Sequence, residues 1–139
     1  MNAWIKRALI VAAAVLGYGG WAVYSNMLGQ PATMDGVAWR AGCIQGSYAG
    51  LLTLVNISIL EALFRFLLQH QGATAATLNT LLASTVAQYS IIIPVHLLNG
   101  TPNILLTLLP GLVIGTAFSS AYLWSLRRYA RYALRDAKR

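Results

Sequence analysis

The sequence predicts an all-α integral membrane protein, a four-transmembrane-helix bundle whose N- and C-termini are both cytoplasmic. Hydrophobic residues make up 58% of the 139 residues and charged residues only 9%, whereas soluble domains carry about 25% charged residues. The only acids are Asp35, Glu61 and Asp136, so charge could not cover a water-exposed surface of ordinary size. Lipid is therefore the expected solvent, and residues 1–139 are expected to form a single membrane domain.

The first apolar stretch, residues 8–28, follows Lys6 and Arg7. About 20 apolar residues suffice to cross the ~30 Å hydrocarbon core. Trp21 and Tyr24 near its end are an interfacial aromatic pair that suits an uncleaved span. A signal peptide begins in the same way, and the alternative that the first span is a cleaved signal peptide stays open.

Three further apolar stretches are separated by polar segments with turn residues. These spans cover residues 42–68, 80–98 and 104–126. We expect connectors at residues 29–40, 69–79 and 99–103, and a basic cytoplasmic tail at residues 127–139. In the last connector, Gly100 suits a helix end and Thr101 suits the N-cap of the next helix.

The orientation follows from the basic residues, because Lys and Arg gather on the cytoplasmic side of short loops. With four spans, the basic residues before the first span, Arg65 at the end of the second, and the tail all lie on one side. We therefore expect a multi-pass protein of a bacterial-type plasma (inner) membrane.

Small residues at fourfold spacing mark faces where helices in lipid approach closely. The predicted helix-packing residues are Gly42, Gly46 and Gly50 in the second span and Gly111 and Gly115 in the fourth. Such glycine stripes can pack against another helix of the same chain or against a second copy in a homo-oligomer. We expect at least one stripe to face another copy.

Polar side chains inside the spans are the candidate coupling or substrate-cavity residues, because each is costly in hydrocarbon without a partner. They are Gln45, Asn56, Glu61, Arg65, Gln88, Tyr89 and His96. Glu61 is the only acid within a span and a candidate proton-coupling group, although Arg65 four residues later offers an ion pair. His96 is expected near the depth of Gln45, as a cavity group or a bonded helix-end histidine.

Other function classes find little support in the sequence. Cys43 is the only cysteine and the two histidines lie in different segments, so no metal site is expected. Nucleophile and phosphate-binding motifs are missing, which argues against an enzyme and against a cofactor. The tail offers binding to anionic lipid head groups or a cytoplasmic partner rather than nucleic acid. Its candidate binding residues are Arg127, Arg128, Arg131 and Arg135.

In size and span number the chain is similar to small four-span transporters of the small multidrug resistance type, and to small flippase-like membrane proteins. Those transporters carry an essential Glu in the first helix, where this chain has no acid, so the sequence identifies no family. Two functions remain. The first is a small oligomeric transporter or flippase-like translocator of a small or lipid-linked substrate. The alternative is a non-catalytic accessory or assembly subunit of a larger membrane complex.

Overall fold

A computed structural model describes the backbone of residues 3–28 and 30–136 and the side chains of residues 5, 8–28 and 30–128. The elements are α1 (Ala3–Met27), the 3-10 turn η1 (Ala32–Met34), α2 (Asp35–His70), α3 (Ala73–Leu98) and α4 (Ile104–Asp136). Every regular element of this described chain is helical, and the four α-helices are long and apolar enough to cross a membrane. The predicted all-helical architecture with four candidate spans is confirmed.

The helices extend further than the predicted spans. Residues 29–40 were predicted as a connector, yet α2 already begins at Asp35, an acid well placed for the positive end of a helix dipole. Residues 69–79 were likewise predicted as a loop, yet α3 begins at Ala73, in a segment rich in good helix formers. Both predictions were wrong because polar residues end an apolar span without ending a helix.

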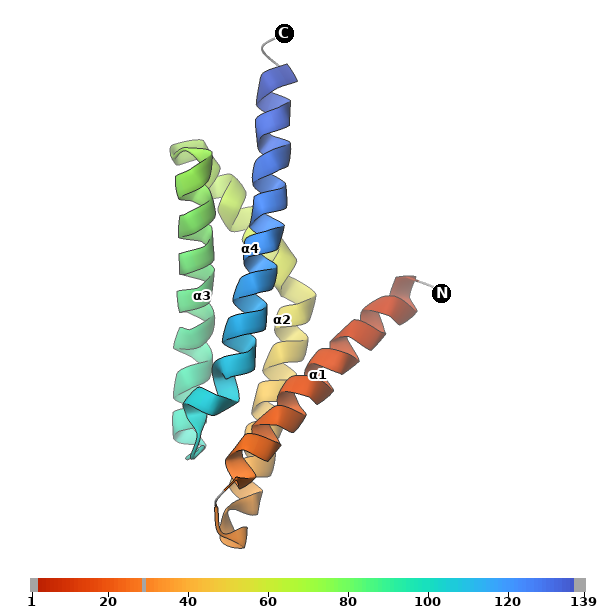
Figure 1. The fold of residues 1–139 in the computed structure, drawn as a ribbon, viewed down its shortest axis with the longest axis vertical. Helices are drawn as coiled ribbons and strands as arrows, with labels where there is room; N and C mark the ends of the chain where they lie inside the picture. The colour runs from red at the N-terminus through yellow and green to blue at the C-terminus, as the bar shows by residue number, and fades with distance from the viewer. Residues whose placement is uncertain (1–2, 29, 137–139) are drawn as a thin grey trace.

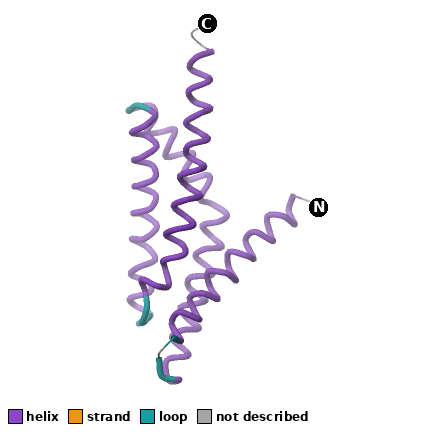
Figure 2. The backbone as a smooth tube through the Cα atoms, viewed as in Figure 1, coloured by secondary structure: helices purple, strands orange, loops and turns teal. Residues whose placement is uncertain are grey.

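The helices pack side by side, and the N-terminal part of α1 leans away from the others (Figure 1). α3 and α4 run side by side with α2 behind them, and short loops join the helices (Figure 2). α1 crosses α2 near the end that carries the α1–α2 connection and then diverges toward its N-terminus (Figure 1). The space between α1 and α4 therefore widens along the molecule.

The glycine stripe of α2 packs against α1 of the same chain. A Cβ added to Gly46 would lie 2.8 Å from the Val15 carbonyl oxygen, and one added to Gly42 would overlap Val23 Cγ2. A Cβ added to Gly50 would lie 2.6 Å from Val15 Cγ2, which is also too close. Because only glycine permits this approach, the stripe is occupied within the chain.

One end of the bundle is held by an apolar core and carries Arg65, Arg127 and Arg128, whereas Arg40 lies near the start of α2 at the opposite end. Leu60 and Phe64 of α2 pack with Ala76 of α3 and Leu123 of α4. At the same end, Arg127 Nη2 donates to Thr74 Oγ1 at 2.8 Å. The side chains of Lys6, Arg7, Arg131 and Arg135 lie outside the described residues.

The turn between α3 and α4 lies at the opposite end. Gly100 has φ +69°, a backbone conformation that glycine adopts without strain, as expected just beyond a helix end. The prediction of Thr101 as an N-cap was wrong, because α4 begins only at Ile104. The Thr101 side chain bonds His96 instead.

Candidate functional site

His96 joins three elements at the end of α3. Its side chain is 0% exposed. Nε2 lies 3.2 Å from Gln45 Oε1 in α2, and Nδ1 lies 3.0 Å from Thr101 Oγ1 in the turn. Because the amide oxygen can only accept, the ring carries its proton on Nε2 and Nδ1 accepts from the Thr101 hydroxyl. The predicted match in depth between His96 and Gln45 is confirmed by this contact.

A second buried cluster attaches α1 to the start of α4. Asn26 Nδ2 donates to Thr107 Oγ1 at 2.6 Å, and Asn26 Oδ1 accepts the backbone N–H of Asn103 at 2.8 Å. Asn103 Nδ2 in turn donates to the Ser25 carbonyl at 2.8 Å. Asn26 thus satisfies a backbone donor that the first turn of α4 leaves without an intrahelical partner.

The predicted polar residues at mid-depth bond to one another. Gln88 Nε2 donates to Asn56 Oδ1 at 3.2 Å, and Asn56 Nδ2 reaches Ser119 Oγ at 3.5 Å. Tyr48 Oη donates to the Gln88 carbonyl at 2.7 Å. These contacts join α2, α3 and α4, and the long Asn56–Ser119 contact is at the weak limit for a hydrogen bond.

Glu61 is held by two partners at the arginine-bearing end. Arg65 Nη2 lies 3.1 Å from Glu61 Oε2, and Tyr122 Oη donates to the other carboxylate oxygen. The side chains are 73% exposed for Arg65 and 33% exposed for Glu61. This arrangement suits a structural ion pair. The partners of Glu61 are different residues from those of His96.

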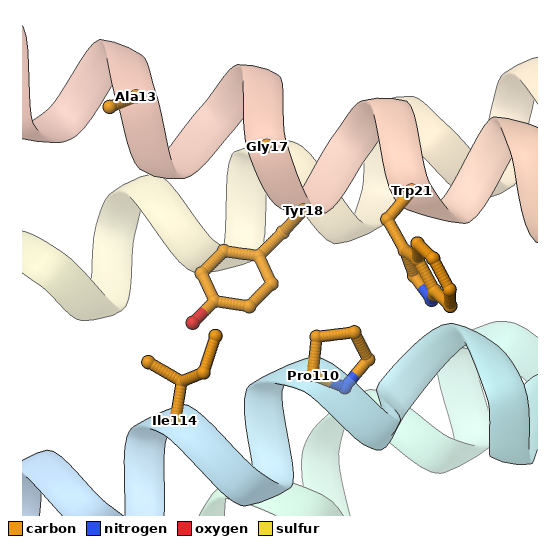
Figure 3. A pocket seen from close by; sticks show the side chains of 6 residues that line it. All are labelled: Ala13, Gly17, Tyr18, Trp21, Pro110 and Ile114. Atoms are coloured by element: carbon orange, nitrogen blue, oxygen red, sulfur yellow. The ribbon is translucent and has the colours of Figure 1, made fainter.

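An apolar groove of about 350 Å³ separates α1 from α4. It is lined by Ala13, Gly17, Tyr18, Trp21, Pro110 and Ile114. Tyr18 and Trp21 extend from α1 toward α4, where Ile114 and Pro110 face them (Figure 3). The hydroxyl of Tyr18 points toward α4 across the groove (Figure 3).

Two polar side chains lie near Gly111, the residue after the groove-lining Pro110. A Cβ added to Gly111 would lie at ordinary contact distances from two side chains, 3.6 Å from Tyr89 Oη and 3.8 Å from Gln45 Nε2. Gln45 and Tyr89, predicted on different helices, thus meet at the predicted glycine stripe of α4. A Cβ added to Gly115, one turn further along α4, would meet no described atom of another helix within 4 Å.

The predicted head-group residues lie at the end of α4. The Arg128 guanidinium carbon lies 5.3 Å from the centre of the Trp124 ring, a cation–π geometry. Arg127 bonds Thr74, as described above. Arg131 and Arg135 belong to the α4 backbone, but their side chains lie outside the described residues.

Sequence reasoning missed several residues of these clusters. Ser25 and Asn26 are fully buried although they end a span, and Thr107 is fully buried within α4. Their polarity at the ends of two apolar stretches was a usable signal, because such residues need partners in lipid. Tyr122 gave no comparable signal, since a tyrosine near the end of a span is also typical of a membrane interface.

No protein-family model matches the chain, and no curated protein or solved structure matches it.

Proposed function

We propose that this chain is a translocator of the bacterial-type plasma (inner) membrane that moves a lipid-linked or similarly amphipathic substrate along the groove between α1 and α4. The supporting observation is the groove itself, whose lining is apolar apart from the tips of two aromatic side chains. It lies between helices whose outer faces carry many exposed large hydrophobic residues. In a bilayer, the apolar material beside such a groove is the acyl chain of a lipid.

Polar side chains at successive depths support a passage for the substrate's polar part. The levels are marked by Gln45 near one end, Asn56 and Gln88 at mid-depth, and Glu61 near the other end. At each depth, the hydrogen bonds of these side chains join two or more helices or two successive turns of one helix. A polar substrate group exchanging hydrogen bonds with these side chains would avoid crossing bare hydrocarbon.

The proposal includes cytoplasmic termini and association of copies. Arg65, Arg127 and Arg128 gather at one end of the bundle, which the positive-inside rule assigns to the cytoplasm. α1 is packed on α2 through glycines and bonded to α4 through Asn26, which favours its retention as a span rather than its removal as a signal peptide. Gly115 leaves room on α4 for a second copy.

The test is lipid transfer by the purified full chain in vesicles of phosphatidylethanolamine and phosphatidylglycerol. A head-group-labelled phospholipid is followed by chemical quenching of the outer leaflet. Ile114→Trp should fill the groove and slow transfer. Val113→Trp is the matched control, because the two positions are 59% and 60% exposed and Val113 does not line the groove. Transfer no faster than in protein-free vesicles would overturn the proposal.

The alternative function, an accessory subunit, is favoured by one specific observation. The polar side chains that could line a passage already bond to one another, as helix-joining groups do. A mild-detergent pull-down read for both proteins and lipids separates the two functions. A partner protein recovered in constant ratio with the wild type and lost with Ile114→Trp, together with no lipid transfer, would establish the accessory role.

A further inference from the structure

Hydrogen bonds join α1 to α4 at one end of the groove. Asn26 Nδ2 donates to Thr107 Oγ1 at 2.6 Å, and Asn26 Oδ1 accepts the backbone N–H of Asn103 at 2.8 Å. Asn103 Nδ2 donates to the Ser25 carbonyl oxygen at 2.8 Å. Ser25, Asn26 and Thr107 are all fully buried. We call these four residues the latch.

The latch lies directly beside the groove. Trp21 is at one end of the groove and Ala13 at the other (Figure 3). Trp21 Nε1 donates to the Leu106 carbonyl oxygen at 2.7 Å, and Leu106 precedes Thr107 of the latch. Ser25 follows Trp21 by about one helical turn. The two walls are therefore hydrogen-bonded to each other from Trp21 to the turn between α3 and α4.

The other end of the groove is open. Among the side chains described there, no hydrogen bond joins α1 to α4 on the N-terminal side of Trp21. Leu9 and Ile10, which continue α1 beyond the groove, are 55% and 59% exposed. α1 also diverges from α4 in this direction (Figure 1). The groove thus opens away from the turn between α3 and α4.

We propose that the latch is a gate that closes the groove toward the non-cytoplasmic leaflet, and that the lipid enters the groove from the cytoplasmic leaflet. The inference rests on the proposed function, because it takes the groove as the path of a lipid. It also takes the end that carries Arg65, Arg127 and Arg128 as cytoplasmic. The gate is closed in this structure, and transfer to the other leaflet requires Asn26 to separate from α4.

The latch has the chemistry of a contact that opens and closes. All its donors and acceptors are uncharged, and the net effect of one neutral hydrogen bond on an equilibrium is only about fivefold. Asn26 lies one residue before the end of α1, and Asn103 directly precedes α4. Water and head groups at the membrane surface can therefore replace the latch bonds when the gate opens.

The packing of α1 indicates which contact yields. A Cβ added to Gly19 of α1 would lie 2.9 Å from the Gly42 carbonyl oxygen of α2, so these two backbones are in direct contact. α1 is joined to α4, in contrast, by hydrogen bonds of side chains such as Trp21 and Asn26. Separation of α4 from α1 breaks these bonds and leaves the glycine contact between α1 and α2 unchanged.

The experiment locks the latch with a reversible disulfide. Ser25 Oγ and Thr107 Oγ1 lie 3.4 Å apart, so cysteines at both positions bring two sulfur atoms close to bonding distance. Ser25→Cys and Thr107→Cys are combined with Cys43→Ser, because Cys43 is the only native cysteine. The full chain is oxidised in detergent with copper phenanthroline and then reconstituted in vesicles. Mass spectrometry after alkylation of free thiols measures the locked fraction.

Transfer of the head-group-labelled lipid should fall at least tenfold in the locked protein and recover after reduction. The reduced form of the same protein is the matched control for the substitutions. Unchanged transfer by a protein that is mostly locked would overturn the gate.

The entry side is tested in the same locked protein. Trp21 is kept as the only tryptophan, and its quenching by brominated acyl chains reports a lipid in the groove. Quenching should persist after locking, because the end of the groove beside Leu9 stays open. Quenching that is lost on locking would show that the lipid enters through the latch, and would overturn the proposed entry side.

A second variant loosens the latch without a cross-link. Asn26→Ala removes two hydrogen bonds to α4, and transfer should become about tenfold faster. Asn79→Ala is the matched control, because Asn79 Nδ2 donates to Gln71 Oε1 at 2.7 Å near the start of α3, and Asn79 does not line the groove. A rate in Asn26→Ala no higher than in Asn79→Ala would overturn the gate. Circular dichroism checks both folds, and the disulfide pair decides if Asn26→Ala fails to fold.

Failure of the gate can be distinguished from failure of the proposed function. Transfer that is blocked by Ile114→Trp but unaffected by the locked latch removes the gate and leaves the translocator. Quenching of Trp21 that persists in the locked protein, together with no transfer by the wild type, removes translocation and leaves a groove that lipid enters from the end opposite the latch.

Discussion

Trp21 of α1 supplies the hydrogen bond that Pro110 removes from α4. Trp21 Nε1 donates to the Leu106 carbonyl oxygen at 2.7 Å. In a regular helix this carbonyl would accept from the N–H of residue 110, which proline lacks. The indole thus satisfies a backbone acceptor that would otherwise be unpaired in hydrocarbon, and it joins the two walls of the groove at that level.

Trp21→Phe should lower the free energy of unfolding by about 1 kcal/mol, because the Leu106 carbonyl loses its donor. In a Pro110→Ala background the same change should cost much less, since an alanine at this position brings back the backbone N–H. Unfolding of all four proteins in mixed micelles measures this double-mutant cycle. Equal costs in the two backgrounds would show that the indole acts only through packing.

Glycine substitutions in α2 should rank by what the new methyl group meets. Gly46→Ala should destabilise most, by about 1–3 kcal/mol, because its Cβ would lie 2.8 Å from the backbone oxygen of Val15. Gly50→Ala should cost less, because its neighbour is the Val15 side chain, which can shift more easily than a backbone oxygen. As a control in α1, Gly20→Ala has open space and should stabilise by about 0.5–1 kcal/mol. A reversed order would contradict the α1–α2 packing.

His96→Ala should destabilise the fold by about 1–3 kcal/mol, because it leaves Gln45 Oε1 buried without its donor. The same unfolding assay applies, and its control is His70→Ala, which removes an exposed ring that meets Phe66 edge-on. If both changes have the same small effect, His96 does not hold the Gln45 amide.

Glu61→Gln should leave the fold intact and lipid transfer unchanged. Its ion pair with Arg65 is largely exposed, and such pairs contribute about 0–1 kcal/mol. A glutamine oxygen can still accept from the Tyr122 hydroxyl. Loss of transfer with normal folding, compared in the vesicle assay with the wild type, would identify Glu61 as a proton-coupling group instead.

The sequence predicted the number and approximate position of the helices because length and hydropathy decide them. It also predicted that His96 and Gln45 share a depth, since both positions follow from counting residues along two helices. The helix ends were harder, because Asp35 and Ala73 begin helical turns in segments that are not apolar enough to be recognised as spans.

Partner choice was the part that the sequence could not supply. The stripe of Gly42, Gly46 and Gly50 indicated a close approach, but the pattern is the same for a helix of the same chain and for another copy. The bonds of Asn26 to Asn103 and Thr107 depend on how two distant helix ends are placed. The approach of Gln45 and Tyr89 to Gly111 depends on three helices at once.

Occupancy of the groove by lipid is tested most directly by quenching of Trp21 with bromine-labelled acyl chains. A single-tryptophan chain, made by changing Trp4, Trp39 and Trp124 to Phe, is reconstituted in vesicles of brominated phospholipid. A second chain that keeps only Trp124 serves as the lipid-exposed reference, since that side chain is 62% exposed. We expect strong quenching of Trp21, comparable to that of Trp124. Trp21 emission that is preserved while Trp124 is quenched would contradict a lipid chain in the groove.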